Sequence, residues 1–352
     1  MRRAIAHAIP WFAGLVAAAN LLFLLAFAAT LLFATAQVRA EVACTGQDLI
    51  AKMAVEEPGK LAAVRAEAAA EPNGHGLLWR VEKPGTAPSF LFGTMHMSDP
   101  RVTKLPAAAE TAFGSATSLV IETTDVLDQS KITEAMLTHP HLMMFTDDGS
   151  LPALLSPEDR ALVEAALAER GIALAAVQKM KPWIIAALVS LPACELARKS
   201  AGEPVLDILL AERAKERGIA VQGLESMVDQ LEAMASLPME FHVRGLVDTL
   251  KLGDGIDDVM ETMLVLYAAG DIAAVWPFFR AVMPAQTEGD EAGFAAFQEA
   301  MIVSRNKVMS EEAAPYFDAG GAFVAVGALH LPGADGLVEL LRASGYTVTR
   351  VE

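Results

Sequence analysis

Two histidines in this chain each follow a glycine by three residues at the end of an apolar run. His96 ends the run that begins at Pro88, and His330 ends the run that begins at Phe323. A short apolar run bounded by turn residues predicts a buried strand, and open α/β sheets bind ligands beyond the carboxyl ends of their strands. Imidazoles brought to that edge from opposite ends of the sequence indicate a shared metal site. The competing interpretation of each histidine is a hydrogen-bonded loop residue after a glycine turn.

Two further β-prone runs end in a carboxylate. Residues 118–121 lead to Glu122, and residues 219–223 lead to Glu225. If these two strands and the two that precede the histidines are parallel neighbours, all four side chains meet at one edge of the sheet.

Two imidazoles with one or two carboxylates, and with positions left for water and substrate, suit a catalytic divalent metal. Nitrogen and oxygen ligands leave Zn, Mn, Co and Fe all admissible. Glu122 is then either a ligand or the base that accepts a proton from water, and its alternative is a surface acid at a strand end. The chain has no His-Glu-x-x-His, no Gly-x-Ser-x-Gly and no phosphate-binding loop, so the common zinc-protease, serine-hydrolase and nucleotide signatures are absent.

Other polar residues have two interpretations each. Glu225 is either a second carboxylate at the edge of the sheet or an acid at the start of a helix. Arg305 could bind a substrate carboxylate or a developing oxyanion in a bidentate manner, with Asn306 as its support, but helix arginines commonly form solvated ion pairs. His139 and His141 could imitate a metal pair, and we interpret them as loop residues.

Strand and helix patterns alternate at both ends of the chain, and the middle is helical. Residues 77–82 and 89–92 flank a Pro-Gly turn and predict a β-hairpin. We predict an α/β fold, with α+β as the alternative, whose mostly parallel or mixed sheet is built from N- and C-terminal segments. A helical insertion over about residues 126–217 could cover the carboxyl-end edge. The apolar run 183–193 is too short to span a membrane and predicts one buried helix bent at Pro192.

The composition is that of a folded, acidic protein. Of 352 residues, 53% are hydrophobic and 20% are charged, which is enough for a substantial core. The formal net charge is −17. Because such an acidic surface repels phosphate backbones, we expect no nucleic-acid partner.

The amino terminus has the pattern of an export segment. Arg2 and Arg3 precede an almost wholly apolar stretch over residues 11–36, and a small-x-small sequence ends at Ala40. We predict a signal peptide over residues 1–40, with an uncleaved anchor as the alternative, because about twenty apolar residues suffice to span a bilayer. Either one places the rest of the chain outside the cytoplasm, periplasmic or secreted, and residues 11–36 could attach it to the inner membrane.

The chain has two cysteines, Cys44 and Cys194. In an exported chain an even pair predicts a disulfide, here one that ties the amino terminus to a distant helix. The alternative is two separate buried thiols.

Several motifs occur in a fixed order between Leu77 and Val351. They are Leu-Phe-Gly-Thr-Met-His at 91–96, Val-Ile-Glu at 120–122, Gly-Leu-Glu-Ser-Met-Val-Asp-Gln at 223–230, Arg-Asn at 305–306 and Val-Gly-Ala-Leu-His-Leu-Pro-Gly at 326–333. In these motifs the chain resembles the TraB/GumN family, which includes the TIKI proteases and belongs to a superfamily with erythromycin-esterase-like and ChaN-like proteins. The resemblance implies that the family's site corresponds to Gly93, His96, Glu122, Gly327 and His330. It also implies Mn or Co as the metal, since the TIKI relatives are metallopeptidases that depend on these ions.

Three regions follow from these observations. They are a signal peptide or membrane anchor over residues 1–40, a helical lead-in over 41–76 and a TraB/GumN-like domain over 77–352.

The expected function is an exported metal-dependent hydrolase that acts on a peptide or protein. Its expected catalytic residues are Glu122, Glu225 and Arg305, and its expected metal ligands are His96, His330 and Glu122. The alternatives are a non-catalytic extracytoplasmic protein that binds haem, a metal or another ligand, and an accessory protein in surface-polysaccharide production.

Overall fold

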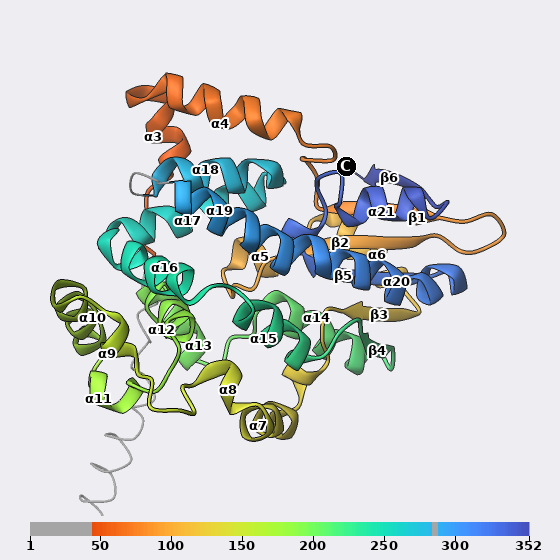
Figure 1. Ribbon diagram of the computed structural model, residues 1–352. Coiled ribbons are helices and arrows are strands. Elements are labelled where there is room, and N and C mark those ends of the chain that lie inside the picture. The colour runs from red at the N-terminus through yellow and green to blue at the C-terminus, as the bar shows by residue number, and fades with distance from the viewer. Residues whose placement is uncertain (1–43, 284–287, 352) are drawn as a thin grey trace, which may run out of the picture. The chain divides into compact units, whose positions relative to one another are not determined.

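Six strands form the sheet that positions the candidate site. The computed structural model describes residues 44–283 and 288–351 (Figure 1). The strands are Leu78–Glu82 (β1), Ser89–Thr94 (β2), Ser118–Ile121 (β3), Ala220–Gly223 (β4), Ala322–Gly327 (β5) and Thr347–Val351 (β6).

These strands lie in the order β4-β3-β5-β2-β1-β6. Neighbours from β4 to β2 pair in parallel, whereas β1 pairs antiparallel with both β2 and β6. The predicted α/β class, the hairpin and the mixed sheet are therefore confirmed. β5, from the carboxyl-terminal part of the chain, pairs in parallel with β2 and β3 from the amino-terminal part, and parallel pairing requires long crossover connections.

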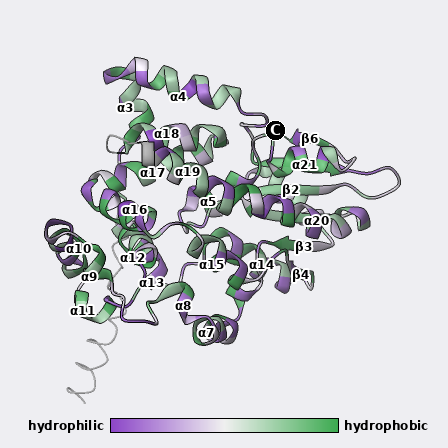
Figure 2. Cartoon of the chain, viewed as in Figure 1, coloured by the Kyte–Doolittle hydropathy of each residue, from purple (hydrophilic) through white to green (hydrophobic). Residues whose placement is uncertain are grey.

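Helices cover both faces of the sheet, because alternate strand residues point to opposite sides. On one face, Phe92 and Phe323 pack with buried residues of α6 (Ala107–Ser115) and α14 (Leu206–Glu216). On the other face, Leu91 and Val324 pack with residues of α20 (Ser304–Ala319) and α21 (Leu337–Ala343). The central strands are consequently hydrophobic on both sides, as the colouring of β2 in Figure 2 shows.

The segment between β3 and β4 is helical, as the insertion was predicted to be. After the 3-10 turn Asp125–Leu127 (η1), its helices are Gln129–Thr138 (α7), Pro140–Met143 (α8), Leu151–Leu154 (α9), Pro157–Glu169 (α10), Leu174–Val177 (α11), Pro182–Val189 (α12), Ala193–Ser200 (α13) and α14. The single bent helix predicted over residues 183–193 is wrong. Pro192 lacks a donor N–H and N-caps α13, so the chain ends one helix and starts another.

A second set of helices follows β4. They are Met227–Ala235 (α15), Met239–Lys251 (α16), Gly255–Ala268 (α17), the 3-10 turn Ile272–Ala274 (η2), Val275–Val282 (α18) and Glu288–Gln298 (α19). A π-helical turn, Glu299–Val303 (η3), joins α19 to α20. The helical stretch therefore runs without a break from Glu288 to Ala319.

The amino-terminal part of the described chain is fastened at two places. The helices Leu49–Glu56 (α3) and Pro58–Ala70 (α4) pack in a cluster with α17 and α18. Cys44 and Cys194 form a disulfide with an S–S distance of 2.07 Å, which confirms the predicted pair. Across residues 44–283 and 288–351, no helix is both long and apolar enough for a membrane span. The predicted leader over residues 1–40 lies outside the described residues, and the division into three regions stays a prediction.

Candidate active site

The carboxyl ends of β2, β3 and β5 open into one cavity. This cavity, which we call the histidine cavity, has a volume of about 380 Å³, and its lining includes His96, Glu122 and His330. The three side chains meet because β3, β5 and β2 are parallel neighbours in the sheet. Glu225, after β4, lies beside the cavity and contacts Arg305, which does line it.

His96 is oriented by a carboxylate of α14. Its Nδ1–H donates to Asp207 over 2.8 Å, and the hydroxyl of Thr94 donates to the same carboxylate over 2.7 Å. Burial opposes protonation of His96, but the hydrogen bond and charge of Asp207 outweigh it and raise the pKa of His96 to about 9. The ring is nevertheless 64% exposed, so the effect of burial is weak and water also screens part of the attraction, and the nearby carboxylate determines the direction of the shift. Asp207 thus leaves Nε2 of His96 as the nitrogen that can face a ligand.

His330 is held by an amide instead. It lies in the 3-10 turn Ala328–His330 (η4) and is almost fully buried. Its Nδ1–H donates to the side-chain oxygen of Asn306 over 2.7 Å, and the Asn306 amide donates to the Asp335 carbonyl over 2.8 Å. This chain of hydrogen bonds fixes the tautomer, so Nε2 carries the lone pair. Burial lowers the pKa of His330 to about 4 and keeps its imidazole neutral.

Glu122 is a buried anion at the floor of the cavity. Its Oε1 accepts from the Gly327 N–H over 2.6 Å, and its Oε2 accepts from Gln230 over 3.0 Å and from Arg305 over 2.6 Å. Burial acts to raise the pKa of Glu122, but the two cavity histidines, Arg305 and the Gly327 N–H together lower it to about 2.

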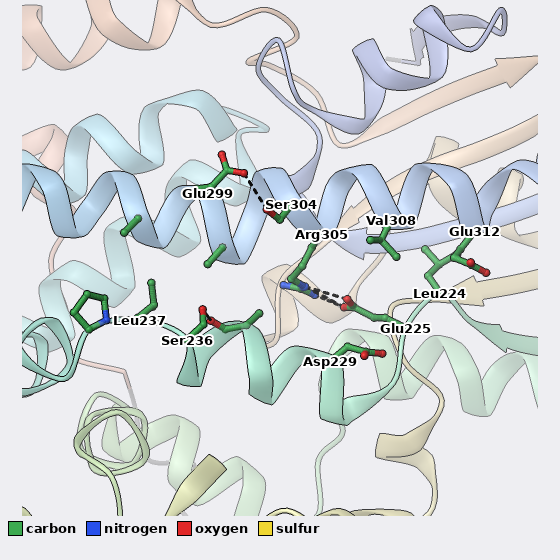
Figure 3. Close-up of a pocket in the computed structure, with 14 residues that line it drawn as sticks. Leu224, Glu225, Asp229, Ser236, Leu237, Glu299, Ser304, Arg305, Val308 and Glu312 are labelled. Carbon is green, nitrogen blue, oxygen red and sulfur yellow. Dashed lines mark hydrogen bonds and ion pairs between the residues drawn. The ribbon is translucent and has the colours of Figure 1, made fainter. Parts of the chain in front are cut away.

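Arg305 joins the two carboxylates. It reaches from α20 across to Glu225, which follows β4 just before α15, as Figure 3 shows. Its guanidinium also donates to Glu122 and to the Met301 carbonyl. We predicted that Arg305 binds a substrate carboxylate or an oxyanion. In the structure, two carboxylates of the protein itself already accept its hydrogen bonds.

The two motif glycines are required by close contacts. A Cβ on Gly93 would lie 2.8 Å from a methyl of Leu331 and 3.0 Å from Ala328 Cα. A Cβ on Gly327 would lie 3.1 Å from Oε1 of Glu122. Glycine at these places lets β2 approach the turn after β5, and lets the Gly327 N–H reach the carboxylate.

The donor set of the histidine cavity suits a divalent cation in part. Nε2 of His330 and Oε1 of Glu122 lie 3.9 Å apart, and two acceptor atoms at that separation are satisfied by a donor or a cation between them. Partners on the Nδ1 side of each imidazole are typical of metal-binding histidines. Within the described ranges, however, no group of three or more His, Cys, Asp and Glu side chains is arranged to hold a metal ion. The described residues therefore bring imidazole and carboxylate donors to one cavity without forming a complete set of metal ligands.

Sequence reasoning missed two residues of the site. Asp207 lies within α14, where an acid in the first turn of a helix is ordinary, and only the packing of α14 on the sheet brings it to His96. Tyr267 of α17 donates from its hydroxyl to the Gly93 carbonyl over 2.9 Å, and burial raises the pKa of its phenol. His139 and His141 do not line the histidine cavity. His139 lies between α7 and α8, whereas His141 lies within α8, so its interpretation as a loop residue is wrong.

These features agree with the family to which the chain's sequence assigns it. The profile of the TraB/PrgY/gumN family matches residues 77–350, so the chain belongs to this family. The chain is also similar to metalloprotease TIKI2 of Danio rerio, with 24% identity over 315 residues. That alignment covers 78% of this chain and 60% of TIKI2, so the chain spans less than two thirds of that relative's length. No solved structure matches the chain.

Proposed function

We propose that this chain is an exported metal-dependent hydrolase that cleaves peptide bonds. One observation carries the proposal: the two imidazoles are held at Nδ1 by Asp207 and Asn306, and they share a cavity with the ionised Glu122. Similarity to a protein named a metalloprotease supports the reaction class and the choice of a peptide or protein as substrate.

In this proposal His96 and His330 bind the metal through Nε2, and Glu122 supplies negative charge beside them. Because the pKa of His96 is about 9 without metal, binding of the metal releases the proton from its Nε2, whereas His330 is already neutral. Mn and Co are the favoured ions by resemblance, and Zn and Fe suit the same ligand types. When bound, the metal polarises the scissile carbonyl and lowers the pKa of a bound water. A pKa of about 2 makes Glu122 a permanent anion at neutral pH and a weak base, so we assign it to charge stabilisation and not to proton transfer.

Arg305 and Glu225 have supporting roles in the proposal. Arg305 neutralises two carboxylates and holds Glu122 in place. Glu225 is the second anion that forms an ion pair with its guanidinium. Both are therefore proposed as positioning residues. The Cys44–Cys194 disulfide supports a location outside the cytoplasm, in the periplasm or secreted, because disulfides persist in oxidising compartments. Attachment to the membrane through residues 11–36 remains a prediction.

The test combines metal content with peptide hydrolysis. Full-length protein is stripped with EDTA, reloaded with Mn, Co or Zn, and incubated with a mixture of unmodified peptides that is then analysed by mass spectrometry. We expect cleavage only after metal loading. His96→Ala and His330→Ala should each lose both bound metal and cleavage, because each removes one of two imidazole ligands.

His75→Ala is the matched control, since His75 is an exposed histidine outside the histidine cavity. This variant should keep wild-type metal content and cleavage. The proposal fails if wild-type protein retains no metal under any loading, or if EDTA-treated protein cleaves peptides as fast as loaded protein. Stoichiometric metal binding without any cleavage would favour a binding protein instead.

A further inference from the structure

A second cavity opens beside the histidine cavity and is much more apolar. This apolar cavity has a volume of about 440 Å³ and lies among α12, α16, α17, α18 and α19, with aromatic rings such as those of Trp183 and Trp276 in its wall. Three residues line both cavities: Met263, Val275 and Leu329. Leu329 directly precedes His330, so the apolar cavity adjoins the second Gly-x-x-His motif.

The apolar cavity also contains polar atoms that lack partners. His242 is 5% exposed, and it is hydrogen-bonded to the Met234 backbone. Its Nε2 and the buried Nε1–H of Trp183 have no hydrogen-bond partner among the described residues. Burial lowers the pKa of His242, which keeps the imidazole neutral. The wall therefore contains one unpaired acceptor and one unpaired donor within a mostly apolar surface, which also includes the polar side chains of Ser190, Arg244, Asp248 and Thr249.

Gly245 keeps space open in the same wall. It lies in the interior of α16, where glycine is less favourable than alanine by about 0.5–1 kcal/mol. Its φ is negative, and a Cβ built on it would meet nothing within 4 Å. Neither backbone conformation nor close packing thus requires glycine here, whereas a larger side chain would extend into the cavity.

We propose that the apolar cavity is a specificity subsite that takes a large apolar side chain, preferably aromatic, next to the scissile bond of a peptide. This inference rests on the proposed hydrolase function and names its substrate class. A pure hydrocarbon chain would leave the two unpartnered polar atoms unpaired, and unpaired buried groups are costly. A peptide segment supplies both an N–H for Nε2 of His242 and a carbonyl for the N–H of Trp183. The volume also falls in the range of about 300–1,000 Å³ that ligand sites commonly have.

The test measures peptide binding without turnover. Full-length protein is stripped with EDTA and titrated with two fluorescein-labelled hexapeptides that differ only in a central Phe or Ala, and binding is followed by fluorescence anisotropy. We expect the Phe peptide to bind at least about tenfold more tightly, because it buries an aromatic side chain. Gly245→Leu should abolish this preference by filling the cavity. Gly114→Leu is the matched control and should keep it, because Gly114 lies in α6, outside the cavity, with equally free space at its Cβ.

A second variant tests the polar atoms independently. Trp183→Phe keeps an aromatic ring but removes the N–H donor, so both peptides should bind about two- to tenfold more weakly while the Phe preference remains.

Equal binding of the two peptides by wild type, or an unchanged Phe preference in Gly245→Leu, would overturn the subsite. It would also be overturned if an N-dodecanoyl version of the Ala peptide bound wild type more tightly than the Phe peptide does, and if Gly245→Leu abolished that tighter binding. This last result would assign the cavity to an acyl chain. Hydrolysis is scored separately in metal-loaded samples. A Phe preference without cleavage rejects the hydrolase proposal alone, and cleavage without the preference rejects the subsite alone.

Discussion

Asp207 accepts a hydrogen bond from Nδ1 of His96 over 2.8 Å, although 111 residues separate them in the sequence. The hydroxyl of Thr94, at the end of the same strand that leads to His96, donates to the other oxygen of that carboxylate. One acid of a covering helix thus fixes both the end of a central strand and the imidazole that follows it. The orientation of His96 depends on how α14 packs against the sheet.

Asp207→Asn should lower the pKa of His96 from about 9 toward its ordinary value of 6.5, since the variant loses the negative charge that favours the imidazolium. The measurement is an NMR titration of the histidine side chains, with His96→Gln used to assign the signal. Asp254→Asn, at the start of α17, is the control and should leave this pKa unchanged. An unaltered titration in Asp207→Asn would show that Asp207 does not set the charge of His96.

Glu122 should make the stability of the fold sensitive to acid. Its folded pKa of about 2 lies below the ordinary value of 4.5, so its contribution to stability is fully present above pH 4.5 and is lost as the pH falls toward 2. The size of that contribution is about 3 kcal/mol, from about 1.4 kcal/mol per pKa unit. Urea unfolding at several pH values between 6 and 2.5 should show a shallower pH dependence for Glu122→Gln than for wild type. Parallel curves for the two proteins would exclude this linkage.

Arg305→Met should destabilise the fold by about 3–5 kcal/mol, because it leaves two buried carboxylates without their shared counter-ion. Adding Glu225→Gln should recover part of this loss, since only one unpaired anion then remains. The readout is the free energy of unfolding in urea at pH 7. The exposed pair of Arg160 and Glu164 provides the comparison, and Arg160→Met should change stability by less than about 1 kcal/mol. Similar losses for the two variants would count against a buried network at Arg305.

Reduction of the Cys44–Cys194 disulfide should lower the free energy of unfolding by about 2–5 kcal/mol, because the bond closes a loop of 150 residues in the unfolded chain. The urea midpoint is measured with and without dithiothreitol. The double variant Cys44→Ser with Cys194→Ser should already be less stable and should not respond to the reductant. A wild-type midpoint that dithiothreitol leaves unchanged would contradict the expectation.

The strand ends could be predicted from the sequence because their signals are local. An apolar run that stops at a glycine, followed by His96 or His330, needs no knowledge of distant residues, and the parallel pairing of β2 with β5 placed these ends together. The partners of the imidazoles could not be found in this way. Asn306 is adjacent to Arg305 and was predicted to support it, yet its side chain binds His330, because the direction of a helical side chain depends on the tertiary packing of its helix.

The same limit applies to the apolar helices. Residues 183–193 have one hydropathy pattern, yet α12 ends at Val189 and α13 begins after Pro192, whose missing N–H prevents a continuous helix.

The π-helical turn at η3 has a geometric consequence for the site. A π turn holds one residue more than an α turn, and each residue of an α-helix advances the direction of its side chain by about 100°. The extra residue therefore sets the direction in which every side chain of α20 points, including those of Arg305 and Asn306 in its first turn. Removing a single residue from this turn would restore a regular helix and rotate both side chains about a quarter of a circle away from Glu122 and His330. The geometry of the histidine cavity therefore depends on the number of residues in this turn as well as on their identities.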